Sequence, residues 1–472
     1  MAAVVAPLIQ PLNPRLQTPR QGGRHVIACK EAWYRLWHWL CARIYFDRIT
    51  VLHPGQIPQR GPVLYLGLHR NGAVDGFVYR QAIPRCVFLI SAQLLGGFFA
   101  RIFFCGIAVR RTTDAAPDQP REHRQHNDEA LQQCVDLLEN GGALFAFPEG
   151  TSSLGPRHLP FKSGAPRIAL AALERGIPLR IIPVGIHYER AWAFRSRVEV
   201  IAGQPIAIDL PAGLSESRRL QEIKRRITAA LADVGVNFES ANALANAERF
   251  AYAATLGTSR SYFEALKSCE KGAGEPLGVD WNTFEQELGS RSCAVLRHQG
   301  WPLFSAGSWF PSALWLIVLS PVVVAGALMN FPPLLAGWLA ARRFADERNV
   351  IALWRILIGL PLLVLWLASL SVTIVCSSGW PWMVAYVALT LAALKGLHQL
   401  KKVAVIVWNE LLHHSLAGRA RELHQLIRRT FHSRVSDLRT GDSEQSDRIK
   451  SASVRPRPEP GLAITATSGK KA

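Results

Sequence analysis

The chain has 472 residues, of which 49% are hydrophobic and 19% are charged. This length allows about two to four domains, which excludes a small disulfide-stapled scaffold, and the charged fraction lies below the roughly 25% usual for soluble domains, which indicates a partly membrane-embedded protein. Lys and Arg outnumber Asp and Glu by 54 to 35, and the formal net charge of +19 favours anionic partners such as nucleic acid, an anionic lipid surface or a phosphorylated substrate.

The eight cysteines show no pattern typical of a zinc site or a disulfide framework. They form no CxxC pair, and most of them lie within apolar runs. We therefore expect reduced cysteines that serve as small apolar residues, which fits a cytoplasmic catalytic part.

The N-terminal region predicts an arm followed by a helix. Residues 1–24 contain four prolines and no acidic residue, and we interpret residues 1–30 as a disordered basic arm. Residues 31–49 have the apolar period of one helix face, rich in tryptophan and tyrosine with arginines interspersed. That composition is typical of an amphipathic helix lying in a membrane interface, and it fits a core helix of a catalytic domain equally well.

Residues 50–235 alternate between short apolar runs and helical patterns. The expected strands cover residues 62–68, 86–91, 143–147, 179–186 and 198–202. The expected helices cover residues 127–140, 165–175 and 215–234. Such alternation predicts an α/β domain in which a mixed sheet is flanked by helices. The pattern of residues 236–298 then predicts a helical region.

Two long blocks without charge follow, and we predict membrane helices over residues 299–400. Residues 299–341 and 356–394 contain no Asp, Glu, Lys or Arg. Since a membrane-spanning helix needs about 20 apolar residues, the second block, broken at residues 377–381, predicts a hairpin of two spans. The first block is interrupted at residues 330–333, and its continuous apolar stretch is too short for two full spans.

Basic residues around these blocks bear on the topology, because basic segments stay on the cytoplasmic side. Arginines lie between the blocks, and Lys401 and Lys402 follow the second one. A re-entrant helical pair that turns at Pro332 and Pro333 keeps every basic segment and the catalytic domain on the cytoplasmic face, and we prefer it to a single span. Residues 401–472 predict a basic helix and a disordered tail.

The first element that can carry chemistry follows the strand expected at residues 62–68. His69 and Asp75 are six residues apart, which on one continuous helix would place them on different faces. Asn71 and Gly72 between them signal a turn, so the backbone can bring imidazole and carboxylate together. A carboxylate bonded to one ring nitrogen leaves the other as a base, which suits activation of a hydroxyl. Taken alone, such a pair more often has a structural role.

Two further segments suit an anionic phosphate. The sequence FPEGTSS at residues 147–153 follows an expected strand, and Lys162 lies just before the next helix. Small hydroxyl residues, free backbone amides and a lysine near a helix start all favour phosphate, although the spacing of nucleotide-binding loops is absent. Arg110 and Arg111 end a β-like segment, and arginine matches phosphate with two parallel hydrogen bonds. By themselves the two arginines would indicate only a solvated charged edge.

In this order, the elements resemble the glycerophospholipid acyltransferase superfamily. The resemblance covers residues 50–235 and rests mainly on FPEGTSS, on PFKSGA at residues 160–165 and on the His–Asp pair. Five residues separate His69 from Asp75 where the common motif has four, and Ser152 stands where many relatives carry arginine. The form His-x-Asn-x-x-x-Asp and the Asn-x-Pro-Pro turn between apolar helices are similar to the glycerol-phosphate and dihydroxyacetone-phosphate acyltransferase branch.

The resemblance implies a role for each motif residue. His69 would be the general base for the acceptor hydroxyl, and Asp75 would orient His69 and stabilise its charged form. The acceptor phosphate would be held by cationic side chains and loop backbone from Arg110, Arg111, Lys162, Gly150, Thr151 and Ser152. Glu149 would shape that loop or bind the acceptor hydroxyl. Acyl-CoA or acyl carrier protein would be the co-substrate, with no metal or other cofactor.

The implied function is transfer of a fatty acyl group to a hydroxyl of glycerol-3-phosphate or dihydroxyacetone phosphate in phospholipid biosynthesis. The implied partners are membrane lipids, the acyl donor and the phosphorylated acceptor. One alternative is acylation of 1-acyl-glycerol-3-phosphate or another lysophospholipid, and an alternative of another class is a catalytically inactive lipid-binding membrane protein. Nucleic-acid binding is not expected, because no recognition motif is present and much of the positive charge flanks apolar spans.

Overall fold

The computed structural model describes residues 21–95, 100–110, 120–211, 213–291 and 293–432. Its centre is a seven-stranded sheet with the strand order β1-β7-β6-β2-β5-β3-β4. The strands are β1 (Arg48–Leu52), β2 (Val63–Gly67), β3 (Val87–Ser91), β4 (Ile107–Val109), β5 (Ala143–Ala146), β6 (Arg180–Tyr188) and β7 (Arg197–Ala202). Neighbouring strands pair in parallel except β6 and β7, which are antiparallel. The predicted mixed sheet flanked by helices is therefore confirmed.

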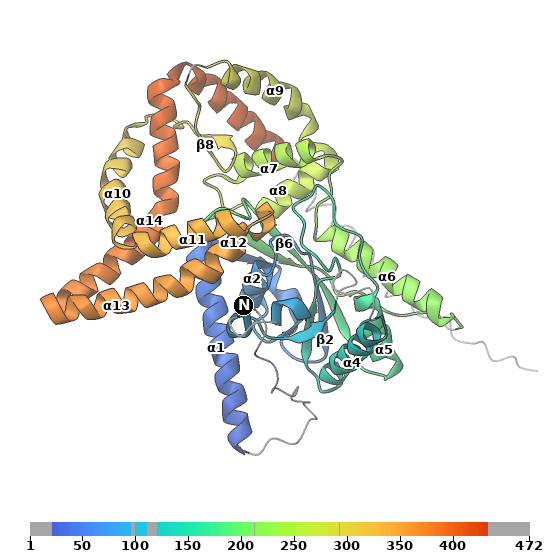
Figure 1. Ribbon diagram of the computed structural model, residues 1–472. Helices are drawn as coiled ribbons and strands as arrows, with labels where there is room; N and C mark the ends of the chain where they lie inside the picture. The colour runs from blue at the N-terminus through green and yellow to red at the C-terminus, as the bar shows by residue number, and fades with distance from the viewer. Residues whose placement is uncertain (1–20, 96–99, 111–119, 212, 292, 433–472) are drawn as a thin grey trace, which may run out of the picture.

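Helices cover both faces of the sheet (Figure 1). Alternate residues of β2 enter two separate hydrophobic cores, since Leu64 and Leu66 pack on one face while Val63 and Tyr65 pack on the other. The first core includes side chains of α4 (Pro120–Glu139), α5 (Gly164–Glu174) and α6 (Glu216–Asp233). The second core includes side chains of α1 (Gln21–Tyr45) and α2 (Val74–Ala82). Because both faces are buried, the central strands are continuous apolar runs in the sequence.

Helix α1 begins at Gln21, so residues 21–30 are helical and are not part of a disordered arm. No proline lies between Pro19 and Pro54, so no residue of the helix lacks its backbone donor. The rest of the expected arm, residues 1–20, lies outside the described residues. One face of α1 is buried in the second core, as a core helix requires. The opposite face exposes apolar side chains that also suit a membrane interface: Trp33, Leu36 and Trp39.

The predicted helical region consists of α7 (Ala241–Thr255), α8 (Tyr262–Ser268) and α9 (Glu275–Gly289). A helix at residues 417–432 packs into the same core through Leu423, Ile427 and Phe431. The boundary expected at residue 401 stays a prediction, although no helix ends there. Helix α14 (Trp380–Leu412) continues across it. The segment expected only as a basic helix is partly buried, because apolar residues recur along one face of its helix. Residues 433–472 lie outside the described residues.

Within the described part of the chain, three helices are long and apolar enough to cross a membrane, and they cover Phe310–Met329, Arg348–Ser378 and Trp380–Leu412. Helices α13 (Leu360–Ser378) and α14 join at Gly379, whose φ of +92° favours glycine. This turn forms the predicted hairpin, which projects away from the sheet (Figure 1). Large apolar side chains on these helices are exposed, as a lipid-facing surface requires.

The first charge-free block forms α10 (Phe310–Met329) and the shorter α11 (Phe331–Phe344). The turn between them is Asn330, a buried residue whose amide donates to Thr390 Oγ1 at 3.1 Å and whose oxygen accepts from the Tyr386 hydroxyl at 2.9 Å. Pro332 and Pro333 fall in the first turn of α11, where a missing N–H costs little. The block thus contains two unequal helices, and their re-entrant placement stays a prediction.

Candidate active site

The predicted site residues lie in loops that follow parallel strands. His69 follows β2, Arg110 follows β4, and the loop at residues 147–153 follows β5. These strands run in the same direction, so the loops at their carboxyl ends meet at one edge of the sheet. Open α/β sheets bind their ligands outside this edge.

His69 and Asp75 meet across a turn, as their spacing predicts. Helix α2 begins only at Val74, and Gly72 in the preceding turn has a φ of +56°. His69 Nδ1 lies 2.9 Å from Asp75 Oδ2. A carboxylate only accepts hydrogen bonds, so Nδ1 carries a proton, and in the neutral ring Nε2 keeps its lone pair. The imidazole therefore has the tautomer that a general base needs.

The Asp75 carboxylate is completely buried and surrounded by donors. Oδ2 also accepts the backbone N–H groups of Arg70 at 2.7 Å and Asn71 at 2.9 Å. Oδ1 accepts the hydroxyl of Tyr188, at the end of β6, at 2.6 Å. A buried carboxylate needs such partners, and together they hold Asp75 in one orientation toward His69.

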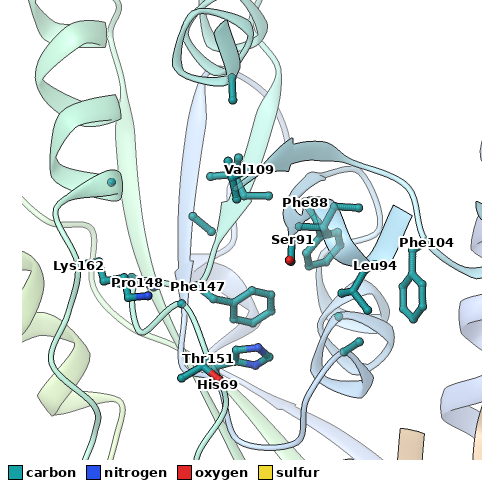
Figure 2. A pocket seen from close by; sticks show the side chains of 18 of the residues that line it. His69, Phe88, Ser91, Leu94, Phe104, Val109, Phe147, Pro148, Thr151 and Lys162 are labelled. Atoms are coloured by element: carbon teal, nitrogen blue, oxygen red, sulfur yellow. The ribbon is translucent and has the colours of Figure 1, made fainter. Parts of the chain in front are cut away.

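The imidazole ring of His69 is held from a second side by Phe147. The two ring centroids are 4.3 Å apart and the rings are nearly parallel, with an angle of 23° between their planes. The side chain of His69 is thereby buried except for an edge that lines a cavity (Figure 2). Phe147 belongs to the predicted loop, but its stacking role was not foreseen from the sequence.

Glu149 is buried beneath the site and does not line the cavity. Its Oε1 accepts the backbone N–H of His69 at 2.9 Å, and its Oε2 accepts the N–H of Leu159 at 3.1 Å. Burial raises the pKa of this carboxyl, and the two backbone donors oppose that rise. The Ser153 N–H in turn donates to the carbonyl of His69 at 3.0 Å. Glu149 therefore ties the two loops together, which agrees with a loop-shaping role and not with contact to the acceptor hydroxyl.

We expect Glu149→Gln to lower the melting temperature in detergent and to reduce the acyl transfer that the resemblance implies. An amide offers one acceptor oxygen where Glu149 supplies two, so a buried backbone N–H would face an NH₂ group, at a cost of about 1–3 kcal/mol. Thermal unfolding and turnover measured side by side check this. The matched Glu139→Gln change alters a half-exposed carboxylate on α4 and should leave both values unchanged. An unaltered melting temperature for Glu149→Gln would contradict the tie between the loops.

Gly150 and Lys162 form a compact basic corner. Gly150 has a φ of +71°, and a Cβ atom at this position would lie 2.8 Å from Lys162 Nζ, so glycine lets the lysine cross the loop. The Lys162 N–H donates to the carbonyl of Pro148 at 2.8 Å. Thr151, beside Gly150, is exposed. Lys162 and the loop at residues 147–153, both predicted to bind phosphate, therefore lie in contact.

Arg110 reaches the same cavity from β4. Its backbone N–H and carbonyl bond the side-chain amide of Asn127 on α4, at 3.0 and 3.1 Å, while its side chain is exposed. Arg111, which was expected to bind phosphate beside it, lies outside the described residues. Ser152 also lines the cavity, and its carbonyl and hydroxyl oxygens both accept from the side-chain amide of Asn349, at 3.2 Å each.

A cavity of about 760 Å³ joins these groups. Figure 2 shows His69 and Thr151 together, Lys162 to one side, and Leu94 and Phe104 to the other. The lining also includes cationic and apolar residues that sequence reasoning missed, among them Arg167, Phe77, Phe88, Val350 and Leu353. The cavity can therefore hold an anionic group at one end and an apolar chain at the other, with the His69 ring between them.

A further carboxyl, that of Glu189, is expected to make the stability of the protein depend on pH. Glu189, next to Tyr188, is buried, and burial raises its pKa from 4.5 to about 7. Between these values the unfolded chain loses the proton while the folded chain keeps it. This stabilising contribution is complete below pH 4.5 and is lost as the pH rises through about 7, a change of about 3 kcal/mol.

We therefore expect Glu189→Gln to flatten that pH dependence. The amide imitates the protonated carboxyl, so the variant should match the wild type near pH 4.5 and melt at a higher temperature at pH 8. Melting curves in detergent at both pH values check this. A variant that melts below the wild type at pH 8 would mean that Arg197, whose Nη1 lies 3.8 Å away, stabilises the ionised Glu189 carboxylate by more than burial destabilises it.

A His–Asp pair between a basic corner and apolar side chains, at the carboxyl edge of such a sheet, fits the acyltransferase domain that the sequence motifs resemble. The family model described as Acyltransferase matches residues 48–187. This segment is an acyltransferase domain of the glycerophospholipid acyltransferase superfamily.

Named relatives are similar to part of the chain. The chain is 32% identical over 117 residues to glycerol-3-phosphate O-acyltransferase 2 of Saccharomyces cerevisiae, covering 24% of this chain and 16% of the relative. It is 38% identical over 150 residues to a 1-acyl-sn-glycerol-3-phosphate acyltransferase of Chlamydomonas reinhardtii, covering 31% and 42%. The crystal structure of the 1-acyl-sn-glycerophosphate (LPA) acyltransferase from Thermotoga maritima aligns over 46% of this chain and 84% of that one, with 20% identity and a TM-score of 0.28. The chain spans between 16% and 62% of the length of the curated relatives it matches.

Proposed function

We propose that this protein transfers a fatty acyl group from an acyl thioester to a hydroxyl of glycerol-3-phosphate or dihydroxyacetone phosphate. The observation that carries the proposal is the His69–Asp75 pair on the wall of a cavity that is basic at one end and apolar at the other. A phosphorylated acceptor suits the side of the cavity with Lys162, and an acyl chain suits the side with Leu94 and Phe104 (Figure 2). The donor is acyl-CoA or acyl carrier protein, and the proposed reaction uses no further cofactor.

The chemistry assigns one step to each group. His69 Nε2 takes the proton of the acceptor hydroxyl as its oxygen attacks the thioester carbonyl carbon. Asp75 stabilises the imidazolium that forms, because its carboxylate is fixed at the other ring nitrogen. When the tetrahedral intermediate collapses, the C–S bond breaks and the leaving thiolate takes the proton back from His69. Lys162 and Arg110 hold the phosphate, which positions the hydroxyl for attack.

The second candidate acceptor is 1-acyl-glycerol-3-phosphate or another lysophospholipid. It is favoured by the printed names of relatives such as the 1-acyl-sn-glycerol-3-phosphate acyltransferases of Chlamydomonas reinhardtii and Haemophilus influenzae. Both candidate classes carry a phosphate and a free hydroxyl, so the same basic corner and base serve either one. The acceptors differ in whether the apolar part of the site must also hold a second chain.

An acceptor panel tests the proposal. The purified full chain in detergent is incubated with labelled acyl-CoA or acyl carrier protein and, in turn, with each phosphorylated acceptor. We expect acceptor-dependent release of thiol and a labelled product with glycerol-3-phosphate or dihydroxyacetone phosphate. Product only with lysophospholipids would select the second candidate. No product with any acceptor, from folded protein, would leave the inactive lipid-binding alternative and overturn the proposal.

We further propose that the catalytic domain lies on the cytoplasmic face of the membrane. Basic residues at the ends of the apolar helices support this, because Arg355 and Lys401 donate to backbone carbonyls of Trp192 and Phe194 in the catalytic domain, at 3.1 and 3.2 Å. Cys376, near the hairpin turn, then reacts with an impermeant thiol reagent from outside sealed cells, whereas Cys293 does not. The reverse labelling pattern would contradict this orientation.

A further inference from the structure

We propose that residues 347–353, which lead into the membrane hairpin, complete the acceptor end of the site, and that Asn349 is a positioning residue for the phosphate-binding loop. The inference rests on the proposed function and deepens it, because it names a determinant of acceptor binding outside the acyltransferase domain. No motif in the sequence marks this segment, and it lies about two hundred positions from the loop that it contacts, at residues 150–152.

The first observation is a direct contact. The side-chain amide of Asn349 donates to both the carbonyl and the hydroxyl oxygen of Ser152, at 3.2 Å each. Asn349 is 5% exposed, so water does not compete freely for these bonds. The backbone carbonyl oxygen of Asn349 would lie 3.3 Å from a Cβ atom built on Gly72, in the turn between His69 and Asp75. One residue from the C-terminal half thus touches the loop after β5 and the turn after β2.

The second observation is that this segment is anchored in the core of the catalytic domain. It comprises a 3-10 turn at Arg348–Val350 and α12 (Ile351–Trp354), and it continues into α13. Ala352 and Ile356 are buried in the second core, together with residues of α1 and α2. Val350 and Leu353 line the cavity that contains His69. The segment is therefore a wall of the site that is continuous with the membrane hairpin.

The third observation concerns Ser152, which stands where the resemblance leads one to expect arginine. A serine brings no charge to a phosphate, and here its hydroxyl is engaged by Asn349. The bonds hold the last residue of the Gly150–Ser152 loop, so the loop amides and Lys162 are set in position before the acceptor arrives. Such ordering in advance lowers the entropic cost of binding. Holding the loop in place thus offsets part of the phosphate-binding energy that an arginine at position 152 would supply.

The experiment measures KM for the acceptor and for the acyl donor separately, using the full chain. We expect Asn349→Ala and Asn349→Asp to raise the acceptor KM about tenfold, the effect of losing one or two hydrogen bonds. Asn349→Asp keeps the size of the side chain and removes the donor. The donor KM should change less than about twofold, because the apolar end of the cavity is untouched. A merely structural defect would lower the amount of active enzyme and leave both KM values unchanged.

Two further variants make the test specific. Ser152→Ala removes one of the two oxygens that accept hydrogen bonds from the Asn349 amide. The KM for the acyl acceptor should therefore rise by less than in Asn349→Ala, and combining the two substitutions should produce no further rise. Asn330→Ala removes another buried asparagine of the membrane region, whose side chain bonds to α10 and α14 and not to the site. It should lower the melting temperature without moving the acceptor KM.

The outcomes separate this inference from the proposed function. Wild-type activity that requires His69, together with an unchanged acceptor KM in folded Asn349→Asp, overturns the inference alone. Absence of acyl transfer to every acceptor overturns both. Should neither Asn349 variant fold, Ser152→Ala decides the matter, because an acceptor KM equal to that of the wild type would show that the contact does not serve the loop.

Discussion

Replacing His69 with alanine should reduce kcat for acyl transfer by about 10²–10⁴-fold, the usual contribution of a positioned general base. The acceptor hydroxyl would then have no group at hand to take its proton. The KM for acceptor and donor should stay close to the wild-type values, because the basic corner and the apolar pocket remain. Turnover with labelled acyl-CoA and the preferred acceptor gives the measurement.

The control for this experiment is another histidine outside the site. His53 is exposed and has a φ of +53°, so His53→Asn keeps a residue that tolerates the left-handed conformation. This variant should transfer acyl groups at the wild-type rate. Circular dichroism and gel filtration in detergent confirm that both variants fold. Full activity in folded His69→Ala would remove the chemical basis of the proposed function.

Asp75→Asn should lower kcat by about 10²–10⁴-fold while leaving the fold largely intact, because it removes the charge that stabilises the imidazolium. The amide oxygen can take the place of Oδ2, which accepts from His69, Arg70 and Asn71. The amide nitrogen then faces the Tyr188 hydroxyl. This hydroxyl can rotate so that its proton points away and its oxygen accepts a hydrogen bond from the amide. The substitution thus keeps the position of the His69 ring and removes the negative charge beside it.

Tyr188→Phe supplies the matched comparison for this prediction. It removes one hydrogen bond to Asp75 Oδ1 and keeps the charge and the bond to His69. We expect a decrease in kcat of roughly tenfold or less, the size of one lost hydrogen bond. If Asp75→Asn loses no more activity than Tyr188→Phe, the carboxylate serves only to orient the ring, and its role in stabilising the imidazolium is wrong.

Much of the catalytic domain could be predicted because its signals are local. The strands at β2, β5 and β6 are continuous apolar runs, and the helix expected at residues 165–175 matches α5 within one residue at each end. The meeting of His69 and Asp75 followed from a turn signal between them. Boundaries were less accurate where packing decided them, as at Gln21, where α1 begins.

The residues that sequence reasoning missed are distant partners of the predicted ones. Tyr188 bonds to Asp75 from the end of another strand, and Phe147 stacks on a histidine that follows a third strand. Asn349 reaches Ser152 from a segment between two apolar blocks. No spacing in the chain could indicate these contacts, because each depends on which strands are neighbours in the sheet and on where the hairpin packs.

The amino-acid sequence by itself determined the class of fold and marked the candidate residues for proton transfer and phosphate binding. These properties follow from composition, from the apolar period and from turn chemistry over a few residues. Only the tertiary structure decided that Glu149 joins two loops from beneath, and that a segment beside the membrane helices forms one wall of the cavity. The physical reason is that buried hydrogen bonds and shared walls form between surfaces far apart along the chain, and the packing of the whole molecule selects them.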